Sequence, residues 1–292
     1  MAGYRADDRK LIATGAGPVE YRDIGSGQPI VFVHGPFVNG ALWDDVVFYL
    51  PLGLRLLRLD LPLGGHHRPA AATADLTSSA MARLLLDFIE TLDLQGVTLV
   101  ANDGGCLICR LASASSDRRV RRIDGMLLTN CDPAGRLGHW HSAIEGPETA
   151  TLDRLAAGLA TPDGRRRFFE RLVWTLPPDE QLDDLLGGFL TDAAIRFDAW
   201  RALRGTADAS ATSDDAFAGP VRIVWGADDA SFPLDVGKHL AEGFMNSGFR
   251  SIPRARLLLP LDQPEALAEA VVEIVEQATR VHATGTWQGG RA

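Results

Sequence analysis

Short apolar runs alternate with amphipathic helical patterns through most of the 292-residue chain. The run Pro29–His34 is almost wholly apolar, as a strand buried on both faces of a parallel sheet should be. Thr77–Leu92 instead repeats its apolar residues at helical spacing, and Thr77 can cap that helix. The alternation predicts an α/β fold with a mostly parallel, eight-stranded sheet and helices on both faces. The predicted strands are Leu11–Thr14, Val19–Asp23, Pro29–His34, Leu54–Leu59, Gly96–Ala101, Ile123–Thr129, Val221–Trp225 and Arg250–Ile252, and helices are expected at Ala41–Leu50, Thr77–Leu92 and Pro264–Ala278.

The alternation breaks between residues 133 and 219, where the pattern shows helical segments and no convincing central strand. Helices are predicted there at Thr151–Leu159, Asp163–Val173, Pro178–Phe189 and Ala193–Leu203. We interpret residues 133–219 as a helical cap inserted into an α/β core made of residues 1–132 and 220–281. The Gly-rich tail, residues 282–292, is predicted to be disordered.

Composition narrows the classes of partner. The net charge of −9 argues against nucleic acid or an anionic membrane surface, since both favour a basic protein. No stretch reaches the roughly 20 apolar residues of a membrane span, and the acidic start of the chain does not resemble a signal peptide, so a cytoplasmic location is expected. Three cysteines do not suggest a disulfide framework. Neither a metal-ligand spacing nor a dinucleotide loop is present, so no metal and no cofactor are expected.

The segment around Asp103 carries the strongest chemical signal. An apolar strand runs into Asn102-Asp103-Gly104-Gly105, and an apolar helix follows. This strand–turn–helix arrangement, with small residues beside the central side chain, is what a nucleophile elbow requires. The alternative is that Asp103 is only a turn residue that tolerates unusual dihedral angles.

Five segments, in this order and at spacings that fit the strands, carry a family resemblance. They are Val31–Gly35, Asp60–Gly64, the elbow at Asp103, Trp225–Asp229 with Phe232-Pro233, and Pro260–Pro264. From about Val19 to Ala278 the chain resembles the α/β-hydrolase superfamily, and within it the haloalkane dehalogenases and epoxide hydrolases, which use an aspartate nucleophile. In such enzymes the carboxylate forms an ester that a histidine-activated water hydrolyses. The resemblance implies that Asp103 is the nucleophile and Asp229 the acid that orients the histidine, although Asp229 could instead be a turn or helix-capping residue.

The chain departs from that family pattern at several positions. Leu257 stands where the histidine is expected, and it cannot accept a proton. Pro36 has no N–H where the family takes one oxyanion donor, which leaves Gly104 unless Phe37 shifts to help. Gly104 also replaces the tryptophan of dehalogenases. The only tyrosines, Tyr4, Tyr21 and Tyr49, lie outside the predicted cap, where epoxide hydrolases keep their acids.

Other residues are candidates for the site because of their positions. His66 and His67 follow a strand, and His139 and His141 flank Trp140 near the start of the cap. Each could replace the missing base, but is more often a surface or loop residue. The pocket is expected to involve Phe37, Asn39, Asn102, Gly104, Leu257, Trp140 and Trp174.

Three functions stay open on this sequence. The first is an enzyme that uses Asp103 as a general base or acid in elimination, isomerisation, ring opening or ring closure of a small apolar metabolite. A second is a hydrolase of an epoxide, halide or ester with a relocated base. The third is a binding protein that has lost catalysis. All three imply a small-molecule ligand and neither nucleic acid nor a membrane as partner. A homodimer is compatible with each.

Overall fold

The computed structural model describes residues 9–131, 150–205 and 216–284. Eight strands form one sheet in the order β1-β2-β4-β3-β5-β6-β7-β8. β1 and β2 pair antiparallel with each other, and β2 pairs antiparallel with β4, whereas the remaining neighbours are parallel. The predicted eight-stranded, mostly parallel sheet is therefore confirmed. The strands are β1 Arg9–Thr14, β2 Gly17–Gly25, β3 Gln28–Val33, β4 Leu54–Asp60, β5 Val97–Asn102, β6 Ile123–Thr129, β7 Val221–Gly226 and β8 Ser247–Ile252.

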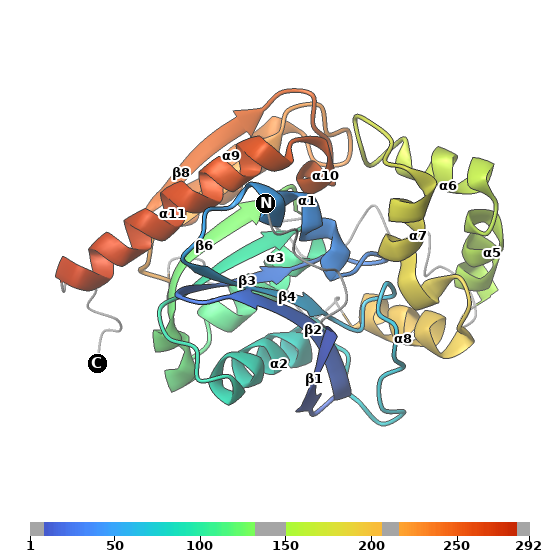
Figure 1. Cartoon of the computed structure of the whole chain (residues 1–292), viewed down its shortest axis with the longest axis horizontal. Coiled ribbons are helices and arrows are strands. Elements are labelled where there is room, and N and C mark those ends of the chain that lie inside the picture. The colour runs from blue at the N-terminus through green and yellow to red at the C-terminus, as the bar shows by residue number, and fades with distance from the viewer. Residues whose placement is uncertain (1–8, 132–149, 206–215, 285–292) are drawn as a thin grey trace.

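Helices cover both faces of this sheet (Figure 1). α2 and α3 pack side by side on one face, and α1 packs against the long α11 on the other. Outside the segment between β6 and β7, the helices are η1 Gly40–Trp43, α1 Asp44–Tyr49, α2 Ser78–Thr91, α3 Gly104–Ser113, η2 Arg118–Arg122, α9 Leu234–Glu242, α10 Leu259–Asp262 and α11 Pro264–Thr284.

The observed helices agree with the predicted ones at one end of α2 and differ from them at two other places. Thr77 caps α2 as expected, because its hydroxyl accepts a hydrogen bond from the Ala80 N–H at 3.2 Å. The single helix predicted for Ala41–Leu50 was wrong in its first turn, which is the 3₁₀ helix η1, capped by the Asn39 side chain. α11 runs to Thr284, so the first three residues of the predicted tail are helical. Residues 285–292 lie outside the described residues.

The segment between β6 and β7 supplies α5 Ala150–Leu159, α6 Pro162–Phe169, α7 Asp179–Leu186, η4 Gly187–Phe189 and α8 Ala193–Arg204. Figure 1 shows these helices gathered at one end of the molecule. The predicted helix Pro178–Phe189 is interrupted at Gly187, whose φ of 51° is outside the helical range. The helical character of this segment is confirmed where it is described, and its treatment as a separate cap domain stays a prediction.

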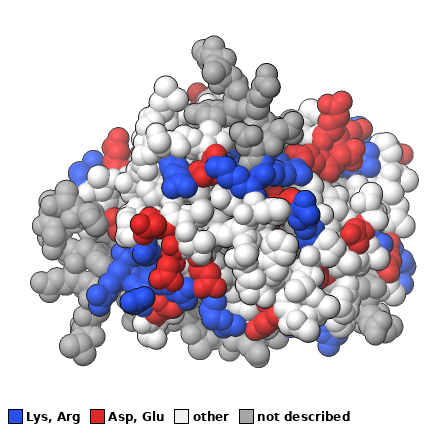
Figure 2. Space-filling view, turned by 60° about the horizontal axis from the view of Figure 1, so that its bottom comes forward, with Lys and Arg blue, Asp and Glu red and all other residues white. Residues whose placement is uncertain are grey.

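Charged side chains of both signs are interspersed on the face shown in Figure 2. The arginines of η2 also have acidic partners. Arg119 pairs with Asp87 and Asp117, and Arg122 pairs with Asp93. These arginines are therefore neutralised by local acids, as expected for a solvated face. Within the described ranges, no helix is long and apolar enough to cross a bilayer.

Candidate active site

The turn at Asp103 has the elbow geometry that the sequence predicts. Asp103 joins the end of β5 to the start of α3 with φ 52° and ψ −128°. Such a conformation costs a non-glycine residue on the order of 1–3 kcal/mol, so the surrounding structure must hold it. The turn also needs small neighbours. A Cβ added to Gly105 would lie 2.5 Å from the Val33 carbonyl oxygen, and one added to Gly35 would lie 2.7 Å from Asp103 Oδ2.

Asp103 is buried, with 2% of its surface exposed. Its backbone N–H donates to the carbonyl oxygens of Thr129 and Asn130, at 3.2 and 3.1 Å, which ties the elbow to the end of β6. The second carboxyl group is that of Asp229. Burial raises the pKa of Asp229, and the charge of Asp103 raises it further, so the two groups are close enough to interact electrostatically. The structure thus brings together the two acids that the sequence pointed to.

Asp229 is held by residues that follow two neighbouring strands, β6 and β7. The Asn130 side chain donates from Nδ2 to Asp229 Oδ2 at 2.8 Å, and the Ser231 N–H donates to Asp229 Oδ1 at 2.8 Å. The same Asn130 accepts a hydrogen bond from the Gly226 N–H through its Oδ1 at 2.8 Å. Asn130, which sequence analysis did not single out, therefore fixes the orientation of Asp229. Its position directly after β6 was the signal that could have revealed it.

Leu257 occupies a fully buried position after β8. Its carbonyl oxygen accepts a hydrogen bond from Asn102 Nδ2 at 2.8 Å, and Asn102 is the residue directly before Asp103. The next N–H, that of Leu258, donates to the Leu172 carbonyl oxygen at 2.9 Å. The loop thus lies against the elbow, and at this position it presents an isobutyl group instead of an imidazole.

The oxyanion donors differ from those of a complete site. Pro36 has no N–H, and the expectation that Phe37 could supply one was wrong, because the Phe37 N–H donates to the Leu63 carbonyl oxygen at 3.0 Å. The φ of Phe37 is 64°, which fixes this loop in an unusual conformation. Gly104 begins α3, and the first N–H groups of a helix have no intrahelical acceptor. Its amide is therefore the candidate donor for an anionic oxygen.

Two predicted pocket asparagines are structural instead. Asn39 is completely buried and donates from Nδ2 to the carbonyl oxygens of Gly65 and Asp184, at 2.9 and 2.6 Å. Asn102 donates to Thr129 Oγ1 at 2.9 Å as well as to Leu257. Both side chains join loops from different strands, and neither lines the pocket beside the elbow.

Neither His34 nor His66 offers a ring nitrogen to Asp103. His34 lies against the Gly35 carbonyl oxygen through Nδ1 at 2.7 Å and accepts from the Leu61 N–H through Nε2 at 2.9 Å, and burial lowers its pKa to about 4. Both ring nitrogens of His34 therefore contact backbone groups. His66 accepts from the Gly64 N–H through Nδ1 and contacts Asp198 through Nε2, each at 3.2 Å.

The remaining described histidines lie elsewhere. His67 lines a different pocket, with Asp60 and Glu20, and β3 separates β4 from β5 there. His239 is exposed on α9. The predictions that His66 or His67 replaces the base were therefore wrong. His139, His141 and Trp140 lie outside the described residues.

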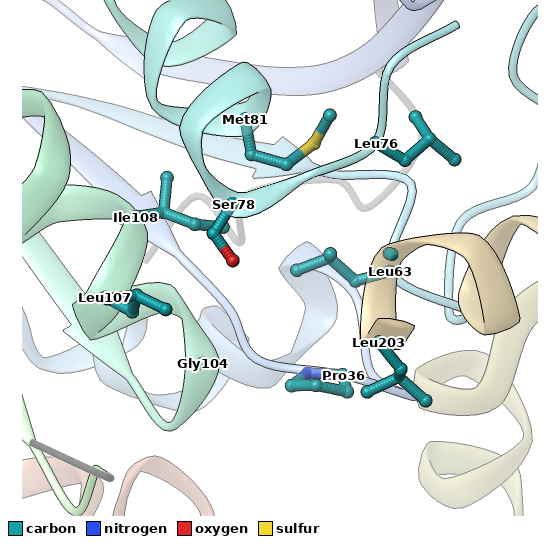
Figure 3. A pocket seen from close by; sticks show the side chains of 10 residues that line it. Pro36, Leu63, Leu76, Ser78, Met81, Gly104, Leu107, Ile108 and Leu203 are labelled. Carbon is teal, nitrogen blue, oxygen red and sulfur yellow. The ribbon is translucent and has the colours of Figure 1, made fainter. Parts of the chain in front are cut away.

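A pocket of about 360 Å³ opens beside the elbow. Its wall is apolar except for Ser78, whose hydroxyl points into the space in Figure 3. The pocket touches Gly104, the residue after Asp103, and Pro36, and α8 closes one side. It is lined by Pro36, Leu63, Leu76, Ser78, Met81, Gly104, Leu107, Ile108, Ala202 and Leu203. Trp174, predicted to line it, is instead 46% exposed and stacks under the Arg256 guanidinium.

A strained acid at a strand–helix elbow, a second acid two strands away and helices between β6 and β7 define an α/β-hydrolase-fold protein. The profile of the Alpha/beta hydrolase family matches residues 30–270, and the chain belongs to this family. The predicted resemblance to that family is confirmed.

The chain is also similar to individual proteins of known name. It is 24% identical to the 2-hydroxy-6-oxononadienedioate/2-hydroxy-6-oxononatrienedioate hydrolase of Paraburkholderia xenovorans over 281 residues, which cover 90% of this chain and 93% of that one. It is 32% identical to a haloalkane dehalogenase of Agrobacterium fabrum over 99 residues, about a third of each chain (34% and 32%). The solved structure of a thermophilic esterase from Thermogutta terrifontis, 22% identical, superposes with a TM-score of 0.67 over 93% of this chain and 99% of that one. This structural likeness supports the fold alone.

Proposed function

We propose that this protein is an α/β-hydrolase-fold enzyme in which Asp103 acts as a general base or acid on a small apolar substrate, without hydrolysis. Elimination, isomerisation, ring opening and ring closure are reactions of this kind. The observation that supports the proposal is the complete burial of Leu257, which stands where the family resemblance predicts the catalytic histidine. An ester formed on Asp103 would have no imidazole from this loop to activate the water that hydrolyses it.

The electrostatics of the elbow favour proton transfer. Asp103 and Asp229 are buried acids within range of each other's charge, and no imidazolium from this loop stands between them. Burial raises the pKa of Asp229, and the charge of Asp103 raises it further. A buried carboxyl group whose pKa is raised toward the working pH can accept or return a proton during a reaction.

The pocket beside Gly104 supports a small apolar substrate. It lies directly beside the elbow, and leucine, isoleucine, methionine, alanine and proline side chains form most of its wall. Most of its lining cannot form hydrogen bonds, and the Ser78 hydroxyl could orient a single polar group of the substrate. The Gly104 amide could stabilise charge that develops on an oxygen of that substrate.

A second candidate function is hydrolysis through an ester on Asp103. The strained elbow favours it, because that turn is how the family presents a nucleophile. This reading requires a base from beyond the last loop, and the candidates His139 and His141 lie outside the described residues.

An Asp103→Asn variant distinguishes these functions. Wild type, Asp103→Asn and the exposed control Asp235→Asn are incubated with a panel of small apolar epoxides, haloalkanes, esters and enol or lactone compounds. Products are analysed by chromatography, and the intact protein by mass spectrometry. Acid–base chemistry predicts that wild type and control convert a compound without an adduct, and that Asp103→Asn loses this turnover.

Two other results point away from the proposal. A mass increase on Asp103 in wild type would assign it the nucleophile role and support the hydrolase reading. Ligand binding that is equal in wild type and Asp103→Asn, with no conversion by either, would identify a binding protein and refute both enzyme readings.

A further inference from the structure

A second pocket, of about 270 Å³, lies at the β2–β4 side of the sheet. Glu20 on β2 and Asp60 at the end of β4 are direct cross-strand partners in the antiparallel register. His67 comes from the loop that follows β4. One ligand atom from each of these three residues lies within 4.8 Å of the others.

Each member of this cluster has a buried atom without a hydrogen-bond partner among the described residues. Asp60 is 2% exposed, and its Oδ1 accepts from the Gly40 N–H at 2.8 Å, whereas its Oδ2 has no partner. Glu20 Oε1 accepts from Arg68 Nε at 2.8 Å, whereas its Oε2 has none. His67 Nδ1 is likewise unpaired. Leaving polar atoms unsatisfied on three neighbouring residues is unfavourable, and a cation held between these residues is one way to satisfy them.

Arg68 pairs with Glu20 at the pocket, whereas the other nearby arginines pair with acids outside the cluster. Arg22 pairs with Asp44 and Asp184, and Arg58 pairs with Asp44. Arg9 pairs with Asp184. These guanidinium groups are therefore committed to acids other than Asp60. Among the described residues, no arginine forms an ion pair with Asp60.

We propose that Glu20, Asp60 and His67 bind a divalent first-row transition cation such as Zn²⁺ or Mn²⁺. One imidazole nitrogen and two carboxylate oxygens are donors that these ions accept, whereas Mg²⁺ and Ca²⁺ prefer oxygen alone. Metal–ligand bonds of about 2.0–2.2 Å place tetrahedral ligand atoms roughly 3.5 Å apart, so the cluster closes by about 1 Å on binding.

The position of this cation indicates a structural role. β3 lies between β4 and β5, so the cluster is about 10 Å from the elbow strand at the usual strand spacing. The metal would join β2, β4 and the loop carrying His67. The same loop contacts α8 through the pair of His66 and Asp198. The cation would thereby stiffen the connection between the sheet and the helices over the apolar pocket, and this inference does not depend on the role of Asp103.

Titration of the metal-free protein tests the site. The full chain is stripped with a chelator and titrated with Zn²⁺ or Mn²⁺ by calorimetry, and its melting temperature is measured with and without each ion. Wild type should bind one equivalent with micromolar or tighter affinity and melt at a higher temperature when loaded. His67→Gln and Asp60→Asn should each weaken binding at least about tenfold and remove the rise in melting temperature. Mg²⁺ and Ca²⁺ should bind more weakly than Zn²⁺ in wild type.

The exposed pair of His239 and Glu242 provides a matched control, because it also joins an imidazole to a carboxylate. A His239→Gln variant should bind the ion like wild type. His67 is half-buried, so His67→Gln should remain folded, as circular dichroism can verify, even if the buried Asp60→Asn does not. Three buried thiols, Cys106, Cys109 and Cys131, are poor competitors, since burial raises the pKa of Cys106 and Cys109 and disfavours the thiolate. Binding that is absent at 0.1 mM metal, or unchanged in His67→Gln, overturns the proposal.

Discussion

Restoring a histidine at position 257 should change which reactions the elbow can perform. The Leu257→His substitution places an imidazole on the loop that Asn102 holds against the elbow through the Leu257 carbonyl oxygen, 2.8 Å from Asn102 Nδ2. That hydrogen bond uses the backbone and survives the change. Asp229 is already oriented by Asn130 and can accept an N–H from the new ring.

The cost and the gain of this substitution can be compared. Leu257 is fully buried, so its loss removes about 2 to 3 kcal/mol of hydrophobic stabilisation, and a fold of this size should tolerate that. General-base catalysis is typically worth 10²- to 10⁴-fold in rate. We therefore expect Leu257→His to hydrolyse at least one small epoxide, haloalkane or ester about 100-fold faster than wild type.

The assay follows product release over a panel of these electrophiles, with the protein mass recorded after each reaction. Leu258→His is the matched control, because Leu258 is the next residue along the chain and is also buried. Its N–H donates to the Leu172 carbonyl oxygen. The control should stay at the wild-type rate. Equal hydrolysis by wild type and Leu257→His would refute the reasoning, since it would mean that another base already serves Asp103.

Three further predictions concern the elbow, a buried histidine and the pocket. Gly105→Ala places a Cβ 2.5 Å from a backbone oxygen of β3 and should lower the free energy of urea unfolding by roughly 1–3 kcal/mol, whereas Gly158→Ala, with nothing within 4 Å, should not lower it. His34 has a folded pKa of about 4, below its ordinary 6.5, so the unfolded state binds the proton more readily and the contribution of His34 to stability falls as the pH drops from 6.5 toward 4. Comparison of wild type with His34→Asn in urea should show that loss as about 2 to 3 kcal/mol between pH 7 and 4.5, and a difference that is constant with pH would contradict it. Ser78→Leu should fill the apolar pocket and raise the KM of any converted substrate at least about tenfold, while Ser79→Leu on the exposed side of the same helix should leave it unchanged.

Local patterns predicted those parts of the fold that local physics determines. An apolar run is buried on both faces of the sheet whatever surrounds it, and Thr77 caps α2 because its own hydroxyl reaches the Ala80 N–H. The small residues around Asp103 are likewise a local requirement of the turn. The elbow and its helix could therefore be placed from sequence. The first turn of Ala41–Leu50 was not placed correctly, and its cap Asn39 also bonds the Asp184 carbonyl oxygen, 145 residues away.

The parts of the site that depend on distant partners escaped prediction for the same reason. The sequence left open that Phe37 shifts to help as an oxyanion donor, but the Leu63 carbonyl oxygen accepts its N–H across a gap of 26 residues. His66 has a side chain that can act as a base, but its Nε2 contacts Asp198 on α8. Glu20, Asp60 and His67 show no linear spacing, and they meet because β2 pairs with β4. A polar side chain in a loop can be recognised from sequence, but its role depends on what the rest of the fold places beside it.

Leu257 is the exception, because its inability to act as a base does not depend on a partner. A leucine side chain has no lone pair that could accept a proton, whatever neighbour lies beside it. Once the strand order places the loop after β8 beside the elbow, the absence of an imidazole from that loop follows from the residue type alone. The buried hydrogen bond from Asn102 shows that the loop does reach the elbow. Any reaction assigned to Asp103 must therefore either avoid water activation by this loop or draw its base from another segment of the chain.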